Sequence, residues 1–213
     1  GGFLLVAMVV VILGSAGILS LERMNAIMKE IAGVRLLSVQ YLQAISKDQT
    51  ALRSEERLLL MSGVNEKDRQ ERIDEVHTVW KQIEEAWSHY EALPQTEDET
   101  AVWEQFTAAW ARWKSDHQCS MELAEDVQKL LKKGLEWDAS RVKGAQAFYV
   151  SEQINSRTSF AEAEKLLDQL VELNIQLGEK SSHEGDVLAT NNYWMLSILL
   201  IAGAGFSLIF GLS

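Results

Sequence analysis

Two uncharged apolar runs frame this chain, one near each end, and every charged residue lies between them. The first run extends from Phe3 to Leu21 and the second from Tyr193 to Leu212. Each is close to the roughly 20 residues that a helix needs to cross the hydrocarbon core of a bilayer. All 31 acidic residues and all 20 Lys and Arg residues lie in the segment from Glu22 to Asp186. The pattern predicts two membrane helices that hold one polar domain between them.

We therefore divide the chain into a first transmembrane helix at residues 1–21, an extracytoplasmic domain at 22–186 and a second transmembrane helix at 187–213. The first run is also compatible with a secretory signal peptide, in which Ser15-Ala16-Gly17 is the small-residue cleavage site. It has no basic stretch in front of it, however, so we favour a span. The middle segment is long enough to bury a core of its own.

Within the middle segment, apolar residues recur at steps of three, four and seven, which is the spacing of one helix face. The first helix is expected to continue from the first span and to end near Gly63. A second helix is predicted from Asp68 to Leu93, where Pro94 stops it. Thr96 followed by Glu99 matches a capping box and predicts the start of a third helix.

The fourth helix is predicted to be regular from about Ser159, where Ser159 and Glu162 match a second capping box, interpreted as a second start after a looser first turn. The stretch from Lys132 to Gln153 is the least regular part, and Gly134 and Gly144 punctuate it. We expect the fourth helix to run on into the second span. The predicted fold class is all-α: an antiparallel up-down-up-down four-helix bundle whose first and last helices are continuous with two transmembrane helices.

Four tryptophans lie at heptad spacing, Trp80 and Trp87 on the second helix and Trp103 and Trp110 on the third. A tight turn between these helices places their apolar faces together, so the rings are expected to pack against one another. We interpret them as core residues in preference to a ligand cage.

Composition narrows the classes of partner. The net charge of −11 argues against a nucleic-acid partner. Cys119 is the only cysteine, so an intrachain disulfide is excluded and stability must come from packing and self-association. The run His117, Cys119, Met121 lacks the C-x-x-C-H pattern of covalent haem and the converging ligands of a metal site. We expect no cofactor and no metal, and interpret Cys119 as buried and His117 as solvated.

No catalytic motif is present in the sequence. The chain contains no G-x-S-x-G, no H-E-x-x-H and no glycine-rich phosphate loop. The paired acids Glu55-Glu56 and Glu84-Glu85 are interpreted as solvated helix faces. We therefore predict that this chain is not an enzyme.

Three stretches carry a resemblance to a known family. Gly2-Phe3 leads into an apolar run that contains Leu13-Gly14 and Gly17-Ile18, Ser159 to Asn174 reads SFAEAEKLLDQLVELN, and Phe206 to Ser213 reads FSLIFGLS. The chain resembles the sensory half of bacterial methyl-accepting chemotaxis receptors of the four-helix-bundle class. The resemblance covers essentially the whole chain.

The resemblance implies a homodimer in the bacterial inner membrane, with residues 22–186 in the periplasm and membrane lipid around both spans. It further implies that a small ligand binds near the membrane-distal end, at the subunit interface. A small shift of the fourth helix and second span would carry the signal to HAMP and signalling domains after Ser213. The same bundle serves some sensor histidine kinases and cyclases, which is the first alternative. A structural membrane scaffold that binds a partner protein is the second.

Two arginines are the first candidates for ligand binding. Arg53 and Arg57 share one helix face at i and i+4, and paired guanidiniums suit a carboxylate, so the expected ligand is anionic. The resemblance places them on two arginines of the family's amino-acid receptors, whereas a third falls on Asp48, which has the opposite charge. The alternative is that both arginines pair with Glu55, Glu56 or acids across a dimer.

A short aromatic stretch supplies the remaining candidates. Phe148-Tyr149 and Gln153 resemble the segment that leads into the family's fourth helix and closes its pocket. Tyr149 offers a ring and a hydroxyl, and Gln153 offers an amide donor and acceptor. The alternative is a local plug that packs the distal end of the bundle. The predicted ligand is a small organic or amino acid bound by Arg53, Arg57, Phe148, Tyr149 and Gln153.

Overall fold

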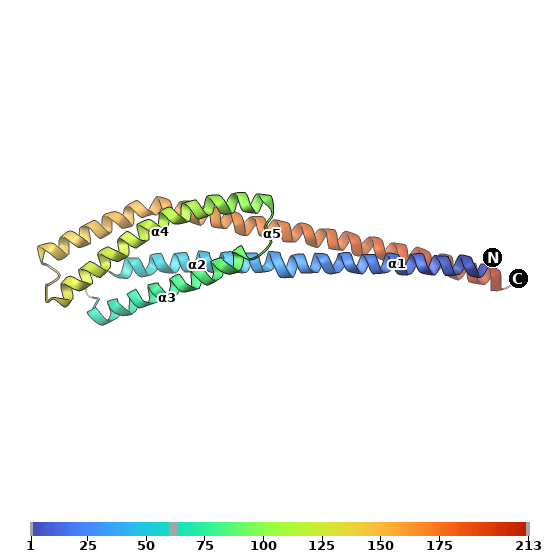
Figure 1. Cartoon of the computed structure of the whole chain (residues 1–213), viewed down its shortest axis with the longest axis horizontal. Coiled ribbons are helices and arrows are strands. Elements are labelled where there is room, and N and C mark those ends of the chain that lie inside the picture. The colour runs from blue at the N-terminus through green and yellow to red at the C-terminus, as the bar shows by residue number, and fades with distance from the viewer. Residues whose placement is uncertain (1, 60–63, 212–213) are drawn as a thin grey trace. The chain divides into compact units, whose positions relative to one another are not determined.

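The computed structural model describes residues 2–59 and 64–211, with side chains for 7–8, 10–59, 64–203 and 205. Within these ranges all regular structure is helical. The helices are α1 (Gly2–Glu30), a π-helical turn η1 (Ile31–Arg35), α2 (Leu36–Leu59), α3 (Glu66–Glu91), α4 (Glu97–Lys132) and α5 (Ser140–Gly211) (Figure 1). They form two compact units, one made of residues 1–36 and 175–213 and the other of residues 37–174.

Helical backbone runs from α1 through η1 into α2 without a break. This stretch contains no proline, so no backbone donor is missing from its hydrogen-bond ladder. The predicted end at Gly63 lies outside the described residues. The predicted domain 22–186 contains the whole of the unit 37–174, and its limits stay a prediction.

Side-chain caps fix the starts of α3 and α4. The Asn65 side chain accepts a 2.8 Å hydrogen bond from the backbone N–H of Asp68. At α4 the Thr96 hydroxyl accepts from the backbone N–H of Glu99 at 3.2 Å, and the Glu99 carboxylate accepts from the backbone N–H of Thr96 at 2.9 Å. These two bonds confirm the predicted capping box, which satisfies backbone donors that have no partner inside the helix.

The predicted second start of the last helix at Ser159 is wrong, because α5 is continuous through this position. After α4, Gly134 adopts a φ of 83°, a left-handed conformation that favours glycine, and α5 already begins at Ser140. Gly144 and Ser159 therefore lie inside α5. The Ser159 hydroxyl bonds the carboxylate of Asp116 on α4 and the backbone carbonyl of Ser156, so its role is to join helices instead of capping one.

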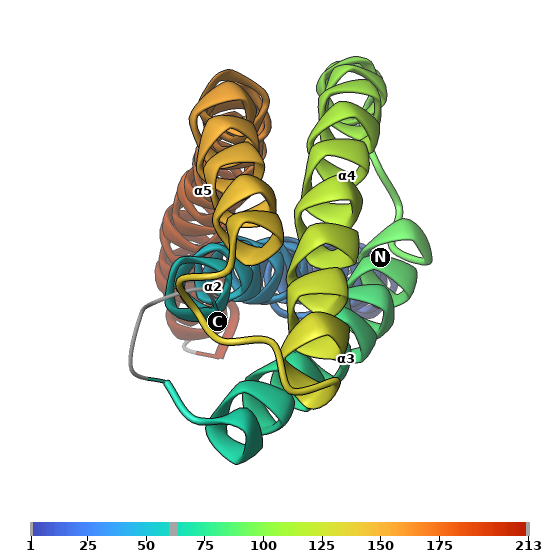
Figure 2. The same cartoon turned by 90° about the vertical axis from the view of Figure 1, so that its left-hand side faces the viewer.

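Aromatic rings fill the space between α3 and α4. The ring centroid of Trp80 lies 5.9 Å from Trp110 and 5.8 Å from Trp113, and that of Trp87 lies 4.5 Å from Trp103. These contacts confirm the interpretation of the heptad tryptophans as core residues. Figure 2 views α2, α3, α4 and α5 from the end at which α4 ends and α5 begins. The largest fully buried side chains include Trp113, Arg69, Tyr90, Phe106, Leu42, Ile45 and Leu167.

The unit formed by residues 1–36 and 175–213 brings α1 and the later part of α5 together. Asn192 donates a side-chain hydrogen bond to the hydroxyl of Ser20. Farther along, a Cβ atom at Gly185 would lie 3.5 Å from Ile27 and one at Gly178 would lie 3.6 Å from the Cβ of Arg35. Both distances are ordinary van der Waals contacts, so the two helices pack against each other at these positions with room for a Cβ atom.

One helix among the described residues, Val10–Leu59, contains a window long and apolar enough to cross a membrane, and that window is wholly unburied. A soluble core helix would bury such a window, so its exposure is consistent with a lipid-facing segment. The second apolar run lies partly outside the described side chains, and its role as a span stays a prediction.

Candidate functional site

Glu56 occupies a core position of α2. The buried residues of this helix recur at steps of three and four, and Glu56 follows Gln49 and Leu52 on the same face. Its side chain is 4% exposed, so a carboxylate lies where the spacing calls for an apolar residue. Burying a carboxylate is costly unless it is hydrogen-bonded. The interpretation of Glu56 as part of a solvated helix face is wrong.

His117 of α4 faces this carboxylate. Its Nδ1 lies against the Glu56 carboxylate, and its Nε2 accepts a 2.9 Å hydrogen bond from the indole N–H of Trp80 on α3. Because Nε2 is an acceptor, the neutral ring carries its proton on Nδ1 and donates it to Glu56. The side chain of His117 is 1% exposed. The prediction that Cys119 is buried and His117 solvated is therefore wrong: His117 is buried and Cys119 is partly exposed.

The first turns of α5 supply the remaining partners of Glu56. The Gln153 amide donates to the Glu56 carboxylate at 3.1 Å and to the Tyr149 hydroxyl oxygen at 3.2 Å. The Tyr149 hydroxyl in turn donates to the backbone carbonyl of Glu56. Burial, followed by the Glu56 charge, raises the pKa of Tyr149 above its ordinary value, so this hydroxyl remains a donor.

These contacts join all four helices of the unit. We call the set Trp80, His117, Glu56, Gln153 and Tyr149 the core polar chain. Tyr149 and Gln153, two of the predicted ligand-binding residues, direct their polar groups to Glu56. This arrangement matches the alternative in which these two side chains pack the bundle as a local plug. A buried polar network whose members are satisfied fixes one packing arrangement, because each shift of a helix leaves a buried group unpaired.

Arg53 and Arg57 flank Glu56 on α2. The guanidinium carbon of Arg53 lies 4.1 Å from the ring centroid of Phe160 on α5. Burial, followed by the charge of Arg57, lowers the pKa of Arg53, although a guanidinium remains charged at neutral pH. Arg57 is exposed. Within the described residues neither arginine has a carboxylate at ion-pair distance.

The two carboxylates expected to pair with these arginines have other partners. Glu55 accepts a 2.8 Å hydrogen bond from Arg72 of α3, and Glu56 belongs to the core polar chain. The alternative in which Arg53 and Arg57 pair with Glu55 or Glu56 is therefore not what the described residues show. Each guanidinium can donate two parallel hydrogen bonds to an anion, which is the forked geometry that suits a carboxylate.

Phe148 and Asp48 complete the predicted set. Phe148 is 58% exposed although its neighbour Tyr149 is buried, because successive helical residues point about 100° apart. Asp48, which stands at the third arginine position implied by the resemblance, is buried on α2. Because this residue is an aspartate, the third positive charge that the resemblance implies is missing from α2.

The sequence reasoning missed Arg157, which belongs to the same region. Arg157 is exposed on α5 and follows Tyr149 and Gln153 at steps of four, so all three share one face. Its charge contributes to lowering the pKa of Arg53. The four-residue repeat on α5 was the signal in the sequence that could have found it.

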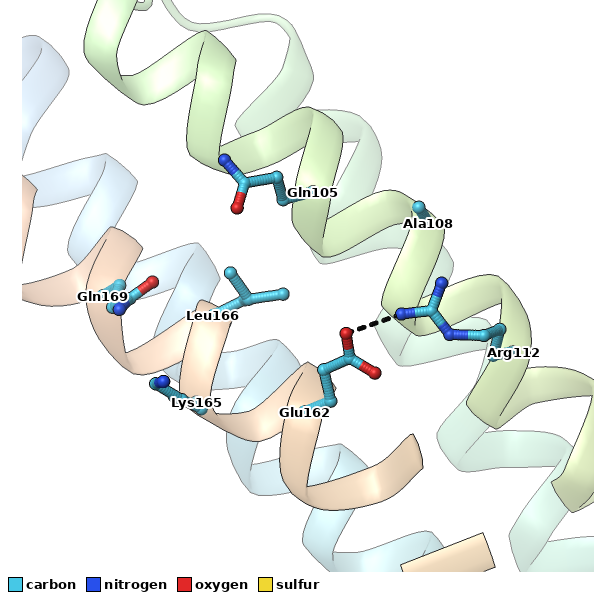
Figure 3. Close-up of a pocket in the computed structure, with 7 residues that line it drawn as sticks. All are labelled: Gln105, Ala108, Arg112, Glu162, Lys165, Leu166 and Gln169. Atoms are coloured by element: carbon cyan, nitrogen blue, oxygen red, sulfur yellow. Dashed lines mark ion pairs between the residues drawn. The ribbon is translucent and has the colours of Figure 1, made fainter. Parts of the chain in front are cut away.

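Two grooves lie elsewhere on this unit. A groove of about 430 Å³ between α4 and α5 is crossed by an ion pair in which Arg112 lies 2.7 Å from Glu162 (Figure 3). Leu166 points into this groove from α5 (Figure 3). A second groove of about 620 Å³ lies between α3 and α4 and reaches Trp80 and His117. No group of three or more His, Cys, Asp or Glu side chains within the described ranges could hold a metal ion.

Comparisons with known proteins agree on the class of domain. The model of the family described as the four helix bundle sensory module for signal transduction matches residues 1–189. No curated protein sequence matches the chain significantly. A solved structure of the periplasmic sensor domain of a sensor histidine kinase is similar in fold, with a TM-score of 0.51 and 14% sequence identity. The similarity covers 76% of this chain and 94% of that one.

Proposed function

Because this chain belongs to the family of four-helix-bundle sensory modules for signal transduction, we propose that it is the transmembrane sensory module of a chemotaxis receptor. Residues 22–186 form the periplasmic domain of an inner-membrane protein, and the two apolar runs cross the membrane. The domain binds a small organic or amino acid and acts as a homodimer. HAMP and signalling domains lie downstream in the whole receptor.

The order of contacts supports an up-down-up-down bundle. Between α2 and α5, Glu56 contacts Tyr149 and Gln153, whereas Arg53 lies over Phe160. Positions that rise along α2 thus meet positions that fall along α5, which is the order expected for antiparallel helices. The ring contacts between α3 and α4 have the same reversed order. Such a bundle directs its first and last helices toward the same membrane face.

The observation that carries ligand binding is the pair of arginines beside the core polar chain, neither of which has a carboxylate partner among the described residues. An anion bound by Arg53 and Arg57 lies next to Glu56, which bonds α4 and α5 directly and is linked to α3 through His117. A ligand changes the output only through a difference in affinity between two states of the bundle. A coupling free energy of about 1–3 kcal/mol is sufficient for a response of roughly 10- to 100-fold.

Thermal unfolding of the whole chain in detergent, with amino acids, organic acids and aromatic acids added one by one, tests this proposal. A stabilising anionic ligand is expected, and Arg57→Ala should abolish its effect while leaving the helical far-UV circular dichroism unchanged. Arg72→Ala is the matched control, because Arg72 pairs with Glu55. If no compound stabilises a folded chain, small-ligand binding fails and a scaffold role is favoured.

A second candidate is the input module of a sensor histidine kinase. A solved structure with a similar fold is the periplasmic sensor domain of such a kinase, which supports keeping this alternative. The bundle and its ligand site are the same in both candidates. Fusion of this chain to the cytoplasmic half of a chemotaxis receptor and of a kinase separates them, since only the native type of output is expected to respond with full amplitude.

A further inference from the structure

His117 is a buried titratable side chain whose two ring nitrogens are both in use. Its Nε2 accepts the 2.9 Å hydrogen bond from the Trp80 indole N–H, and its Nδ1 lies against the Glu56 carboxylate. An indole N–H can only donate, and an ionised carboxylate can only accept. The neutral ring with its proton on Nδ1 is therefore the one form of His117 that satisfies both neighbours.

A second proton on this ring has opposite effects on its two contacts. Histidine is the side chain that changes its charge between about pH 5 and pH 8, and the added proton goes to Nε2 because Nδ1 already carries one. Two donors then meet, so the hydrogen bond from Trp80 of α3 to His117 of α4 is lost. The contact between Nδ1 and Glu56 is kept and becomes an ion pair, which is stronger than a neutral hydrogen bond.

The groove between α3 and α4 gives solvent protons access to this ring. It has a volume of about 620 Å³ and is lined by both Trp80 and His117. The Trp80 side chain is only partly buried. Water that enters the groove can accept the released Trp80 N–H and the new Nε2–H of His117, so neither donor has to stay unpaired at a cost. This bond can therefore open while the rest of the core stays packed.

The groups that face His117 lie on all four helices of the unit. On α2 the Glu56 carboxylate is in direct contact, and Arg53 and Arg57 flank it. Two uncharged groups of α5 reach the same carboxylate, those of Tyr149 and Gln153. The groove adds three carboxylates, two ammonium groups and a second histidine, which are Glu84, Glu122, Glu125, Lys81, Lys114 and His77. Because Coulomb energy falls with distance, Glu56 is the counter-ion of a protonated His117.

We propose that His117 makes this unit responsive to acidity, because a proton bound at Nε2 breaks the contact with Trp80 and turns the contact with Glu56 into an ion pair. α3 then keeps its ring contacts with α4 but leaves the core polar chain. α2, α4 and α5 stay joined through Glu56. This response is independent of the anionic ligand, since neither Arg53 nor Arg57 takes part in the step.

Proton–nitrogen NMR spectra of the whole chain in detergent, labelled with ¹⁵N-tryptophan and recorded between pH 8 and pH 5, test the proposal. The chain has seven tryptophans, and the Trp80 indole signal is the one missing from the Trp80→Phe variant. We expect this signal to shift on acidification. Exchange of its N–H with solvent, relative to free indole at the same pH, should become about tenfold faster as the hydrogen bond is lost.

His117→Gln is the decisive variant, because its amide offers a donor to Glu56 and an acceptor to Trp80 but takes up no proton in this range. Its Trp80 signal should stay constant from pH 8 to pH 5. The control His77→Gln removes an exposed histidine from the same groove and should leave the transition unchanged.

Three results would overturn the proposal: a constant Trp80 signal in the folded wild-type chain, a transition that persists in His117→Gln, or one that disappears in His77→Gln. If His117→Gln does not fold, the ring signals of His117 in the wild-type chain decide. Their midpoint has to coincide with that of the Trp80 signal, and a different midpoint would overturn the proposal as well. None of these results bears on the binding of an anion by Arg53 and Arg57.

Discussion

The indole N–H of Trp80 donates a 2.9 Å hydrogen bond to Nε2 of His117 and so fixes which ring nitrogen of the neutral histidine carries the proton. The proton is on Nδ1, which faces the carboxylate of Glu56. A surface histidine would be free to exchange its tautomers. Here one hydrogen bond from α3 determines that the His117 side chain of α4 is the donor in its contact with α2.

Removal of the Glu56 carboxylate should destabilise the fold. Glu56→Ala leaves the His117 N–H and the Gln153 amide without their acceptor inside the core. We expect a loss of about 3 kcal/mol in the free energy of unfolding, since breaking a buried pair leaves its partner uncompensated. Urea unfolding followed by far-UV circular dichroism measures this change.

The neighbouring acid provides the matched control for that variant. Glu55 pairs with Arg72 at a partly exposed site, where an ion pair contributes about 1 kcal/mol or less. Glu55→Ala should therefore cost much less than Glu56→Ala. Equal losses for the two variants would contradict the assignment of Glu56 to the core polar chain.

Alkaline pH should reveal the buried hydroxyl of Tyr149. Burial, followed by the Glu56 charge, raises the pKa of Tyr149 above its ordinary value of 10.0, so above that pH the unfolded chain loses a proton that the folded chain keeps. Rising pH therefore favours unfolding, with a slope that approaches about 1.4 kcal/mol per pH unit. Tyr149→Phe removes this contribution.

The comparison needs urea unfolding of both proteins between about pH 9 and pH 11. At neutral pH, Tyr149→Phe should lose about 1 kcal/mol, because one hydrogen bond to the Glu56 carbonyl disappears. Above pH 10 the gap should narrow as the wild-type protein loses stability faster. A gap that stays constant across this range would show that Tyr149 ionises equally in both states.

Arg69 is expected to be essential for the start of α3. Its guanidinium is buried and donates to the carbonyls of Leu59 at 2.8 Å and Val64 at 2.7 Å and to the side chain of Gln128 at 3.0 Å. It also lies 4.6 Å from the ring centroid of Trp137. Arg69→Met should cost about 3 kcal/mol, because buried acceptors lose a charged donor.

Arg112→Met serves as the comparison for this prediction, since Arg112 forms a half-exposed ion pair. Its loss should change the unfolding free energy by about 1 kcal/mol or less. Thermal unfolding monitored by circular dichroism distinguishes the two variants. A midpoint for Arg69→Met that matches that of Arg112→Met would rule out the proposed role of the buried guanidinium.

Cysteine crosslinking should detect the contact between α1 and the later part of α5. Asn192 and Ser20 are joined by a side-chain hydrogen bond, so Ser20→Cys with Asn192→Cys should form a disulfide within one chain in a Cys119→Ser background. Ser15→Cys with Asn192→Cys is the control, because five residues shift the position by about 7.5 Å along a helix. The chain is then cleaved between α3 and α4, and a non-reducing gel shows whether the disulfide keeps the two fragments linked. Equal crosslinking of both pairs would contradict this register.

The sequence by itself determined the class of this protein and the layout of its helices. The charge-free runs, the heptad tryptophans and the Thr96 and Glu99 capping box are local signals, because each depends on residues within a few turns of one another. The same locality explains why the family resemblance could be found from short motifs. The start of α5 was missed because Gly144 looked like a break, whereas packing inside the unit overrides such a weak preference.

Only the tertiary structure decided what the polar residues do. Glu55 and Glu56 are adjacent and chemically identical, yet Glu55 pairs with Arg72 at the surface and Glu56 lies in the core with His117. That difference depends on contacts between residues more than 60 positions apart, which no local pattern records. The free energy of a buried charge depends on its partners in space, and those partners exist only once the helices have packed.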